Sequence, residues 1–475
     1  MKHHGLFFAL IVLMSAGCTG WRAARQPEPI APDTYVRLVS SPGVFGDSLW
    51  WPALGDTALD AVMAEAFAQN LTLRQAVARL DQYRALYVVA RSALLPTVSA
   101  AGTYSRSGDV GSGEEAAPSP MITSSPTTQY SAALSASYEL DIWGRLTAGR
   151  AAAMADLHAT EENLHALAAT LAAQVARTYY QVAEQREQID LLDRTISSYT
   201  DSHALVEARY QRGVARSLDV YQAETNLAGA RARRAAAVAG LAAKEHALSV
   251  LLGRYPGSAT DVKARLPEEL PDIQPGLPSE LVTRRPDVKA AYWAMMAADR
   301  RSAEAAANRL PRFSLTGSVS GSSDELKDAL DPDGMIWNAI ANLLVPIFEG
   351  GRRRAQADAA EAGWEMAAAA YRQALLNAFR EVEDGLILRQ QQREYLRELE
   401  AQVRSAEASL RLATEQYLRG VSDYLPVVVA QATYFNAQSS RIAARRGLLD
   451  AHIGLVTALG GGWAAEVVEP PEGSN

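Results

Sequence analysis

Cysteine is almost absent from this chain of 475 residues: Cys18 is the only one, so no disulfide can form within the chain. Aromatic residues are also few, at 7% of a sequence that is 48% hydrophobic. With alanine abundant, that balance is typical of helices packed closely side by side rather than of a bulky globular core. An excess of basic residues is missing as well, because the formal net charge is −8. Nucleic-acid binding requires clustered lysine and arginine, so the charge argues against such a partner.

Motifs for catalysis are missing too. No glycine-rich loop ends in Gly-Lys-Ser or Gly-Lys-Thr, and the seven histidines are scattered without metal-ligand spacing. The segment GSVSG, residues 317–321, is similar to a hydrolase elbow but has valine where the nucleophile must be. The sequence therefore predicts no enzyme, no cofactor and no bound metal.

The first residues have the layout of a signal peptide. Lys2 precedes an apolar run at residues 6–14 that is too short to span a bilayer, and small residues then lead to Cys18. A lone cysteine directly after a signal sequence resembles the acylated first residue of a bacterial lipoprotein, although Ser15 stands where leucine is usual. Thr19 stands where an inner-membrane retention signal would show aspartate, so the resemblance implies lipidation of Cys18 and the outer membrane. The alternative is a spare thiol near an ordinary cleavage site.

The two halves of the chain repeat one plan. Residues 71–102 align without a gap with residues 286–317, which pairs one Leu-Pro with another. Further along, YQRGV at 210–214 matches YLRGV at 417–421. The interpretation is a tandem duplication. We expect the following segments: signal peptide 1–17, lipidated N-terminal segment 18–69, first repeat 70–253, proline-rich linker 254–284, second repeat 285–460 and C-terminal tail 461–475.

Each repeat reads as helix, strand, strand, long helix, turn and helix. Apolar residues alternate with serine or threonine in four segments, which predict strands at 97–105, 129–140, 313–320 and 336–347. Such stretches are typical of transmembrane barrel strands, with lipid on one side and water on the other. A soluble sheet lying on a helical layer would show the same alternation, so the strands alone leave both alternatives open.

The helices favour the membrane alternative. Residues 145–212 contain no proline, show the 4-3 spacing of helices packed along their length, and would extend about 100 Å. A first helix at 70–95, capped by Asn70, and a return helix at 217–252 would together match that length. In RRPDV, residues 284–288, proline and aspartate predict a plain helix start. The expected fold is mainly α with a transmembrane β portion.

Four strands cannot span a bilayer alone, because their open edges would leave backbone groups unpaired in lipid. Closed barrels start at about eight strands, so the chain is expected to oligomerise. Two copies would give a barrel filled by side chains, whereas three would give twelve strands around an open lumen. The face rich in serine and threonine favours three.

The chain resembles an outer-membrane factor of the TolC type, in the lipoprotein branch that serves resistance-nodulation-division multidrug efflux systems. The resemblance covers almost the whole mature chain and depends on the two RGV turns and four phrases: GLPSELVTRRPDVKAA (276–291), LPRFSLTGS (310–318), YELDIWGRL (138–146) and PIFEGGRRRA (346–355). It implies a homotrimer with a twelve-stranded barrel in the outer membrane, continued by an α-helical barrel across the periplasm. It also implies a passive exit duct for drugs or other small molecules that works with an inner-membrane transporter and a periplasmic adaptor (membrane fusion) protein. The alternatives are the duct of a type I protein secretion system or a structural coiled-coil surface protein.

The two RGV turns would then lie at the periplasmic tips of the helices. Gly213 and Gly420 suit the left-handed position that ends a helix, and Arg212 and Arg419 complement the negative helix ends. Ser217 and Asp423 are the expected N-caps of the two returning helices.

The family's periplasmic end narrows like an iris, which implies a gate at these tips. The two turns differ after the shared frame, with Arg216 opposite Asp423. We expect Asp423, with Tyr424, to contact Arg216 or Arg212 of an adjacent hairpin, and three copies of Asp423 to form an acidic ring. The alternative is that Asp423 only caps its helix.

Overall fold

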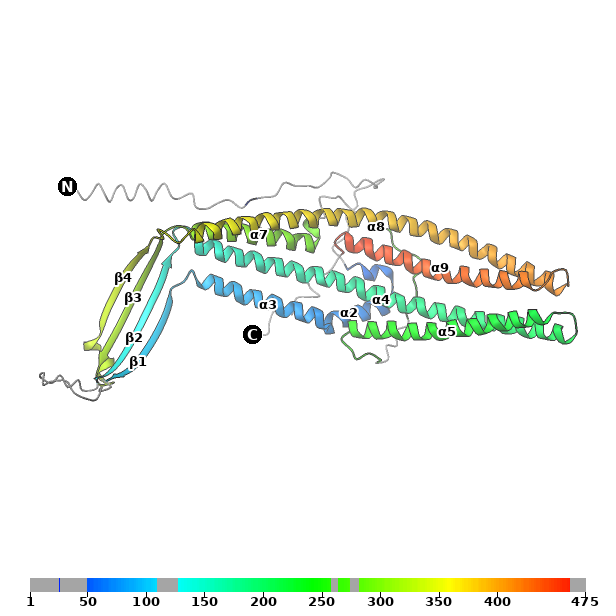
Figure 1. Cartoon of the computed structure of the whole chain (residues 1–475), viewed down its shortest axis with the longest axis horizontal. Coiled ribbons are helices and arrows are strands. Elements are labelled where there is room, and N and C mark those ends of the chain that lie inside the picture. The colour runs from blue at the N-terminus through cyan, green and yellow to red at the C-terminus, as the bar shows by residue number, and fades with distance from the viewer. Residues whose placement is uncertain (1–24, 26–48, 109–126, 258–263, 274–281, 462–475) are drawn as a thin grey trace, which may run out of the picture. The chain divides into compact units, whose positions relative to one another are not determined.

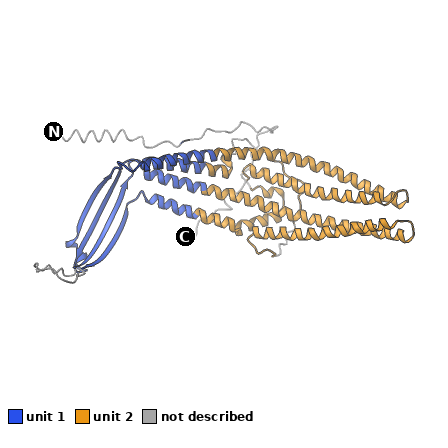
Figure 2. Cartoon of the chain, viewed as in Figure 1, with its two compact units in different colours: residues 1–28, 81–159, 292–370 blue, residues 29–80, 160–291, 371–475 orange. Residues whose placement is uncertain are grey.

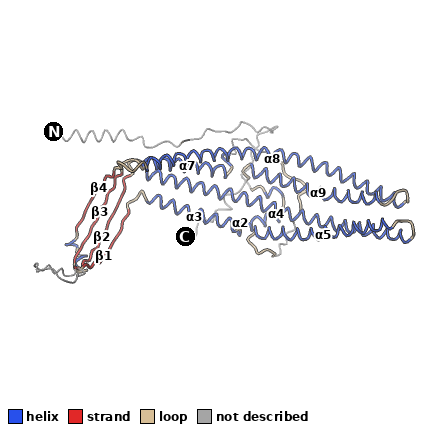
Figure 3. The backbone as a smooth tube through the Cα atoms, viewed as in Figure 1, coloured by secondary structure: helices blue, strands red, loops and turns tan. Residues whose placement is uncertain are grey.

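The computed structural model describes residues 25, 49–108, 127–257, 264–273 and 282–461, and it divides into two compact units (Figures 1 and 2). Unit 1 comprises residues 1–28, 81–159 and 292–370, and unit 2 comprises residues 29–80, 160–291 and 371–475. Each unit therefore takes residues from both halves of the sequence. Most described residues are helical, and all four strands lie in unit 1 (Figure 3).

The strands of unit 1 form one antiparallel sheet in the order β1-β2-β3-β4. Their bounds are Thr97–Ser107 for β1, Thr127–Leu140 for β2, Arg312–Ser323 for β3 and Ile336–Leu344 for β4. The predicted strands are confirmed to within three residues at each end. The two repeats meet inside the sheet because β2, from the first half, pairs with β3, from the second half. Strands β1 and β4 are the two edges.

The register divides the sheet into an apolar and a polar face. Directly opposite residues share a face, and one row across the sheet consists of Ala100, Leu134, Val319 and Trp337. Trp337 in this row is 75% exposed in the chain. The neighbouring row on the other face is Ser99, Ser135, Ser318 and Asn338, and the first two hydroxyls lie 2.9 Å apart. On β1, β2 and β3 the alternation in the sequence is thus realised as an apolar and a polar face, whereas β4 also places Ile336 and Ile340 opposite Ser320 and Thr316 on the polar face.

All four helix connections leave the sheet at one end. The register pairs Leu140 with Phe313 and Arg312 with Leu344, which brings the end of β2, the start of β3 and the end of β4 together. The phrase YELDIWGRL makes the turn from β2 into α4 (Arg145–Gln211). There Asp141 accepts hydrogen bonds from the amides of the first helical turn at 2.9 and 2.7 Å. We call this end of unit 1 the sheet–helix boundary.

The remaining helices are long and rich in alanine. Their bounds are α2 Thr57–Gln69, α3 Leu71–Ser92, α5 Ser217–Leu251, α7 Pro286–Ala307, α8 Arg352–Leu418 and α9 Leu425–Ala458. Helices α4 and α8 each contain 67 residues and so extend about 100 Å. The predicted packing stripe of α4 is buried between Leu164 and Val182, apart from half-buried Thr178, whereas Tyr210 is 48% exposed. Among the described residues, no helix is both long and apolar enough to cross a membrane.

Helix α2 lies in a stretch for which the sequence analysis predicted no element. Asp56 caps it, because its carboxylate accepts from the amides of Ala58 and Leu59, both at 3.1 Å. The hydroxyl of Tyr179, itself fully buried, donates to the same carboxylate at 2.9 Å. The cap thus ties the start of α2 to α4 within unit 2.

Candidate functional site

The two RGV turns lie side by side at the end of the hairpins α4–α5 and α8–α9 in unit 2 (Figure 1). Gly213 has φ 75° and Gly420 has φ 76°, in the left-handed region that favours glycine. In the first turn, the amides of Gly213 and Val214 donate to carbonyls of α4 at 2.8 and 3.0 Å. Gly420 and Val421 repeat this pattern on α8 at 3.1 and 3.0 Å. Both turns are therefore Schellman motifs, which satisfy the last carbonyls of each long helix.

The expected N-caps are wrong by one residue in both turns. Helix α5 begins at Ser217 itself, and the N-cap is Arg216, whose amide donates to the carboxylate of Asp219 at 3.2 Å. Helix α9 begins at Leu425 with Tyr424 as N-cap and no side-chain cap bond. Pro426 lies in the first turn of α9 and has no amide hydrogen, which removes one of the donors that a capping side chain would satisfy. Asp423 therefore does not cap α9.

Charged side chains meet where the turns face each other. The guanidinium of Arg216 lies 3.3 Å from Asp219 and 3.8 Å from Asp423, so it links α5 with the second turn. The side chain of Asp219 is 7% exposed, whereas those of Arg216 and Asp423 are 60% and 78% exposed. The ion pair between Arg216 and Asp423 is consequently solvated and weak, and it stabilises the contact between the hairpins by about 0.2–1 kcal/mol.

The two other arginines of the turns, Arg212 and Arg419, do not take part in this contact between the hairpins. Arg419 pairs with Glu415 one turn earlier on α8. Arg212 is exposed, and the described part of the chain gives it no ion pair. The structure thus brings Arg216 and Asp423 together within one chain, and it does not bring Arg212 to Asp423.

Beneath the charged rim lies an apolar cluster that joins both hairpins. It consists of Val206, Ala223, Ala413, Tyr417, Tyr424, Val427 and Ala430. Tyr424 is 2% exposed and its ring centroid lies 5.3 Å from that of Tyr417. The guanidinium of Arg209 lies over the other tyrosine ring at 4.7 Å. Burial raises the pKa of Tyr424 to about 12, so its hydroxyl stays protonated at physiological pH.

One buried amide ties α9 to α4 just inside this cluster. Gln431 is 4% exposed, and its Nε2 donates to the hydroxyls of Ser202 at 2.7 Å and Ser198 at 3.3 Å. Removing such a buried pairing leaves polar groups without partners, which costs about 1–3 kcal/mol. Near the turns the two hairpins are therefore held together by the apolar cluster and this buried amide, and only weakly by the charged pair at the rim.

Several residues of this site were not predicted from the sequence. Tyr417 could have been found, because it occupies the same frame position as Tyr210, but only the second copy is buried, at 5% against 48% exposure. Arg209 and Asp219 carry no repeat signal, since the residues at the matching positions of the second copy are Gln416 and Pro426. Cys18, the predicted acylation site, lies outside the described residues. Among the described residues, no group of three potential ligands is placed to hold a metal ion.

The chain matches a known family model twice. The model described as "Outer membrane efflux protein" covers residues 62–254 and again 277–461. The toluene efflux pump outer membrane protein TtgF of Pseudomonas putida is 31% identical over 98% of both chains. The cation efflux system protein CusC of Escherichia coli is 30% identical over 95% of this chain and 97% of its own length.

The fold is also similar to those of solved outer-membrane channels. A crystal structure of CusC superposes with a TM-score of 0.83 at 27% identity and covers 93% of this chain and 99% of that chain. The open state of the Neisseria gonorrhoeae MtrE outer membrane channel superposes with a TM-score of 0.80 at 28% identity. It covers 93% of this chain and 98% of that chain.

Proposed function

Since the chain belongs to the outer membrane efflux protein family, we propose that it is the outer-membrane exit duct of a tripartite efflux system. The observation that carries this function is the two-faced sheet of unit 1, with an apolar face rich in exposed side chains and an opposite face on which β1, β2 and β3 carry mainly serine and threonine. One face suits lipid and the other suits a watery lumen. The duct passes small molecules without chemistry of its own.

A closed barrel needs several chains. Strands β1 and β4 are unpaired edges within one chain, and unpaired backbone groups are excluded from lipid. Three copies would join β1 of one chain to β4 of the next and give twelve strands, enough for an open lumen. The proposed assembly is therefore a homotrimer in the outer membrane, anchored additionally by an acyl group on Cys18.

The partners follow from the proposed role. The relatives TtgF and CusC are named as outer-membrane or efflux components of pumps for toluene and for cations. A passive duct needs a transporter in the inner membrane to supply energy and an adaptor in the periplasm to join the two. The adaptor would meet the duct at the RGV turns if these form its periplasmic end.

The RGV turns are the proposed gate. The contact of Arg216 with Asp423 at 3.8 Å joins the hairpins at the rim, and its exposure keeps it weak. Three copies would stabilise the closed state by about 3 kcal/mol at most, which an adaptor can overcome on binding. A relative crystallised in an open state supports a channel that changes its aperture.

The gate is tested by conductance in planar bilayers. Asp423→Ala should raise the open fraction at least about threefold, the effect of three contacts at the weak end of the range. Glu415→Ala is the matched control, because it removes an exposed carboxylate that pairs within α8 rather than between hairpins. Equal conductance of wild type and Asp423→Ala would reject the gate and leave the duct intact.

The duct itself is tested in cells and in detergent. Deleting the gene should lower efflux, measured as increased retention of a fluorescent dye, without loss of secreted protein. The opposite outcome would favour a type I protein secretion duct. Purified protein should run as a heat-sensitive trimer with pore activity, and a monomer without pore activity would contradict the proposed function.

A further inference from the structure

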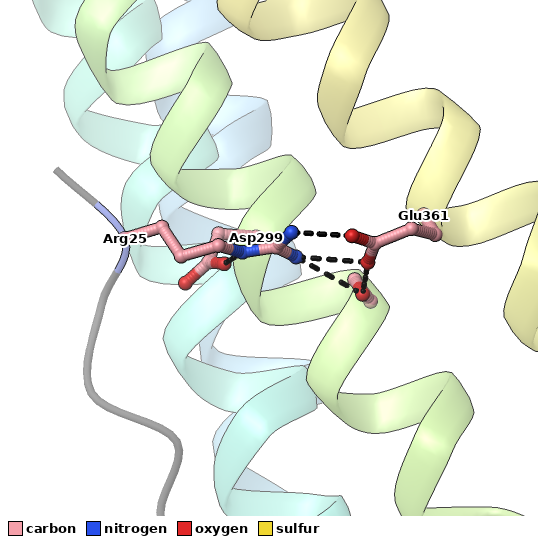
Figure 4. A network of polar contacts seen from close by, with 4 residues as sticks. Arg25, Asp299 and Glu361 are labelled. Atoms are coloured by element: carbon pink, nitrogen blue, oxygen red, sulfur yellow. Dashed lines mark hydrogen bonds and ion pairs between the residues drawn. The ribbon is translucent and has the colours of Figure 1, made fainter. Parts of the chain in front are cut away.

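Arg25 lies against α7 and α8 within unit 1, far in sequence from both helices (Figure 4). Its Nε donates to Asp299 at 2.8 Å, and its two terminal nitrogens donate to the carboxylate of Glu361 at 2.5 and 3.0 Å. A further contact of 3.4 Å reaches the hydroxyl of Ser302, and the guanidinium carbon lies 3.7 Å from the ring centroid of Trp364. All three guanidinium nitrogens therefore donate hydrogen bonds, and the ring of Trp364 covers one face of the group.

The groups around Arg25 are bonded to one another as well as to the guanidinium. Asp299 is 3% exposed and Ser302 is 5% exposed, so neither side chain is a chance surface contact. The hydroxyl of Ser302 also donates to Glu361 at 2.8 Å, which fixes that carboxylate in the orientation a planar fork requires. A buried carboxylate such as Asp299 needs a cation beside it, because desolvation penalises an unpaired charge. Two carboxylates, a hydroxyl and an indole face together select a guanidinium over an ammonium group.

The pocket lies close to the sheet–helix boundary. Asp299 is eight residues before the end of α7, and Glu361 is nine residues after the start of α8. At ~1.5 Å per residue the pocket is about 12–14 Å along the helices from the boundary. Cys18 precedes Arg25 by seven residues, and an extended chain of that length reaches at most about 25 Å. The tether is therefore long enough to connect the pocket with the boundary, and it keeps Cys18 within about 25 Å of the pocket.

We propose that Asp299, Ser302, Glu361 and Trp364 form a binding site for the guanidinium of Arg25, which latches the N-terminal segment to unit 1. Because the boundary lies within the reach of this tether, the latch allows an acyl group on Cys18 to enter the membrane near the sheet. The second statement depends on the lipid anchor of the proposed function, whereas the latch itself does not.

Trypsin provides a direct test, since it cleaves after arginine and must take the guanidinium into its own pocket. The purified full-length protein in detergent is digested for short times, and the rates of cleavage after Arg25 and after Arg22 are measured by mass spectrometry. Glu361→Gln keeps the shape of a side chain that is 40% exposed but removes the charge. It should speed cleavage after Arg25 at least about tenfold relative to cleavage after Arg22.

Arg25→Lys is the second variant, because lysine is still a trypsin site but cannot form the fork or stack as well. It should also be cleaved faster at residue 25 relative to residue 22. An unchanged ratio in both variants would overturn the latch, and a variant that unfolds as a whole is recognised by a fall in thermal stability. The mass of the fragment 18–25 reports acylation on the same molecules. If Arg25 is protected from trypsin but Cys18 carries no acyl group, the lipid anchor is rejected and the latch is kept. If Cys18 is acylated but Arg25 is not protected, the latch is rejected and the lipid anchor is kept.

Discussion

Acidification should weaken unit 2 through one histidine, His452 on α9. Its side chain is 2% exposed, and its Nδ1 is buried without a hydrogen-bond partner among the described residues. Burial, together with the positive charges of Arg389 and Arg393, lowers the pKa of His452 from 6.5 to about 4. The folded chain therefore keeps this imidazole neutral at a pH where the unfolded chain would protonate it.

The sign and size follow from proton linkage. Between about pH 6.5 and pH 4 the unfolded state binds more protons, so stability is complete above this window and falls as the pH falls through it. With pKa values of 6.5 and about 4, the loss at pH 5 amounts to about 2 kcal/mol per chain. Replacement by leucine removes the titrating group and should abolish this part of the pH dependence.

The assay is urea unfolding of the detergent-purified protein at pH 7.5 and pH 5.0. The quantity compared is the change in the free energy of unfolding between the two pH values, in wild type and in His452→Leu. His246→Leu, at an exposed histidine, is the control for a general effect of losing one imidazole. If wild type and His452→Leu lost the same free energy at pH 5.0, the reasoning from burial would be refuted.

Two further predictions concern backbone and charge in unit 2. Both Gly213→Ala and Gly253→Ala place a side chain at positive φ, which costs about 1 kcal/mol, but only the second meets a neighbour, the carbonyl of Gln69 at 2.5 Å. Gly253→Ala should therefore lower the free energy of unfolding by at least about 1 kcal/mol more than Gly213→Ala, and equal losses in urea titrations would contradict the clash. Arg285→Ala should cost about 1–3 kcal/mol, because this buried guanidinium donates to the carbonyl of Ala458 at 2.9 Å and pairs with Glu381 at 2.7 Å, and the half-exposed carboxylate left behind can be solvated by water. A loss below about 1 kcal/mol in the same titrations would mean that the pairing does not stabilise the fold.

The regular elements could be predicted because their signals are local. The period of two in the strands, the long stretch without proline in α4 and the glycine at each RGV turn each fix a conformation within a few residues. The cap of α3 was predicted for the same reason, since Asn70 accepts from the amide of Leu73 at 2.9 Å. Such signals depend on neighbours in the sequence, so a single sequence suffices for them.

What escaped prediction depends on distant partners. Asp56, the N-cap of α2, accepts a hydrogen bond from Tyr179, which lies 123 residues away in the sequence. No periodic pattern in the sequence predicts a bond between residues so far apart. RRPDV was interpreted as a plain helix start, yet Arg285 also joins α7 to α8 and α9 through Glu381 and Ala458. The burial of Tyr424 likewise depends on residues of four helices. Long-range charge pairs are visible only once the chain is folded.

The pairing of β2 with β3 has a consequence for biogenesis. These strands come from different repeats, and Tyr130 opposes Ser323 across nearly two hundred intervening residues. A chain that stopped after the first repeat would hold only the hairpin of β1 and β2, and the edge of β2 that pairs with β3 would stay open, which makes such a species prone to aggregate in the periplasm. The four-stranded sheet can therefore be completed only after β3 and β4 have been exported, and such distant contacts form slowly. The duplication therefore gives the chain two helical hairpins but only one sheet, and we expect that sheet to insert into the membrane as a whole.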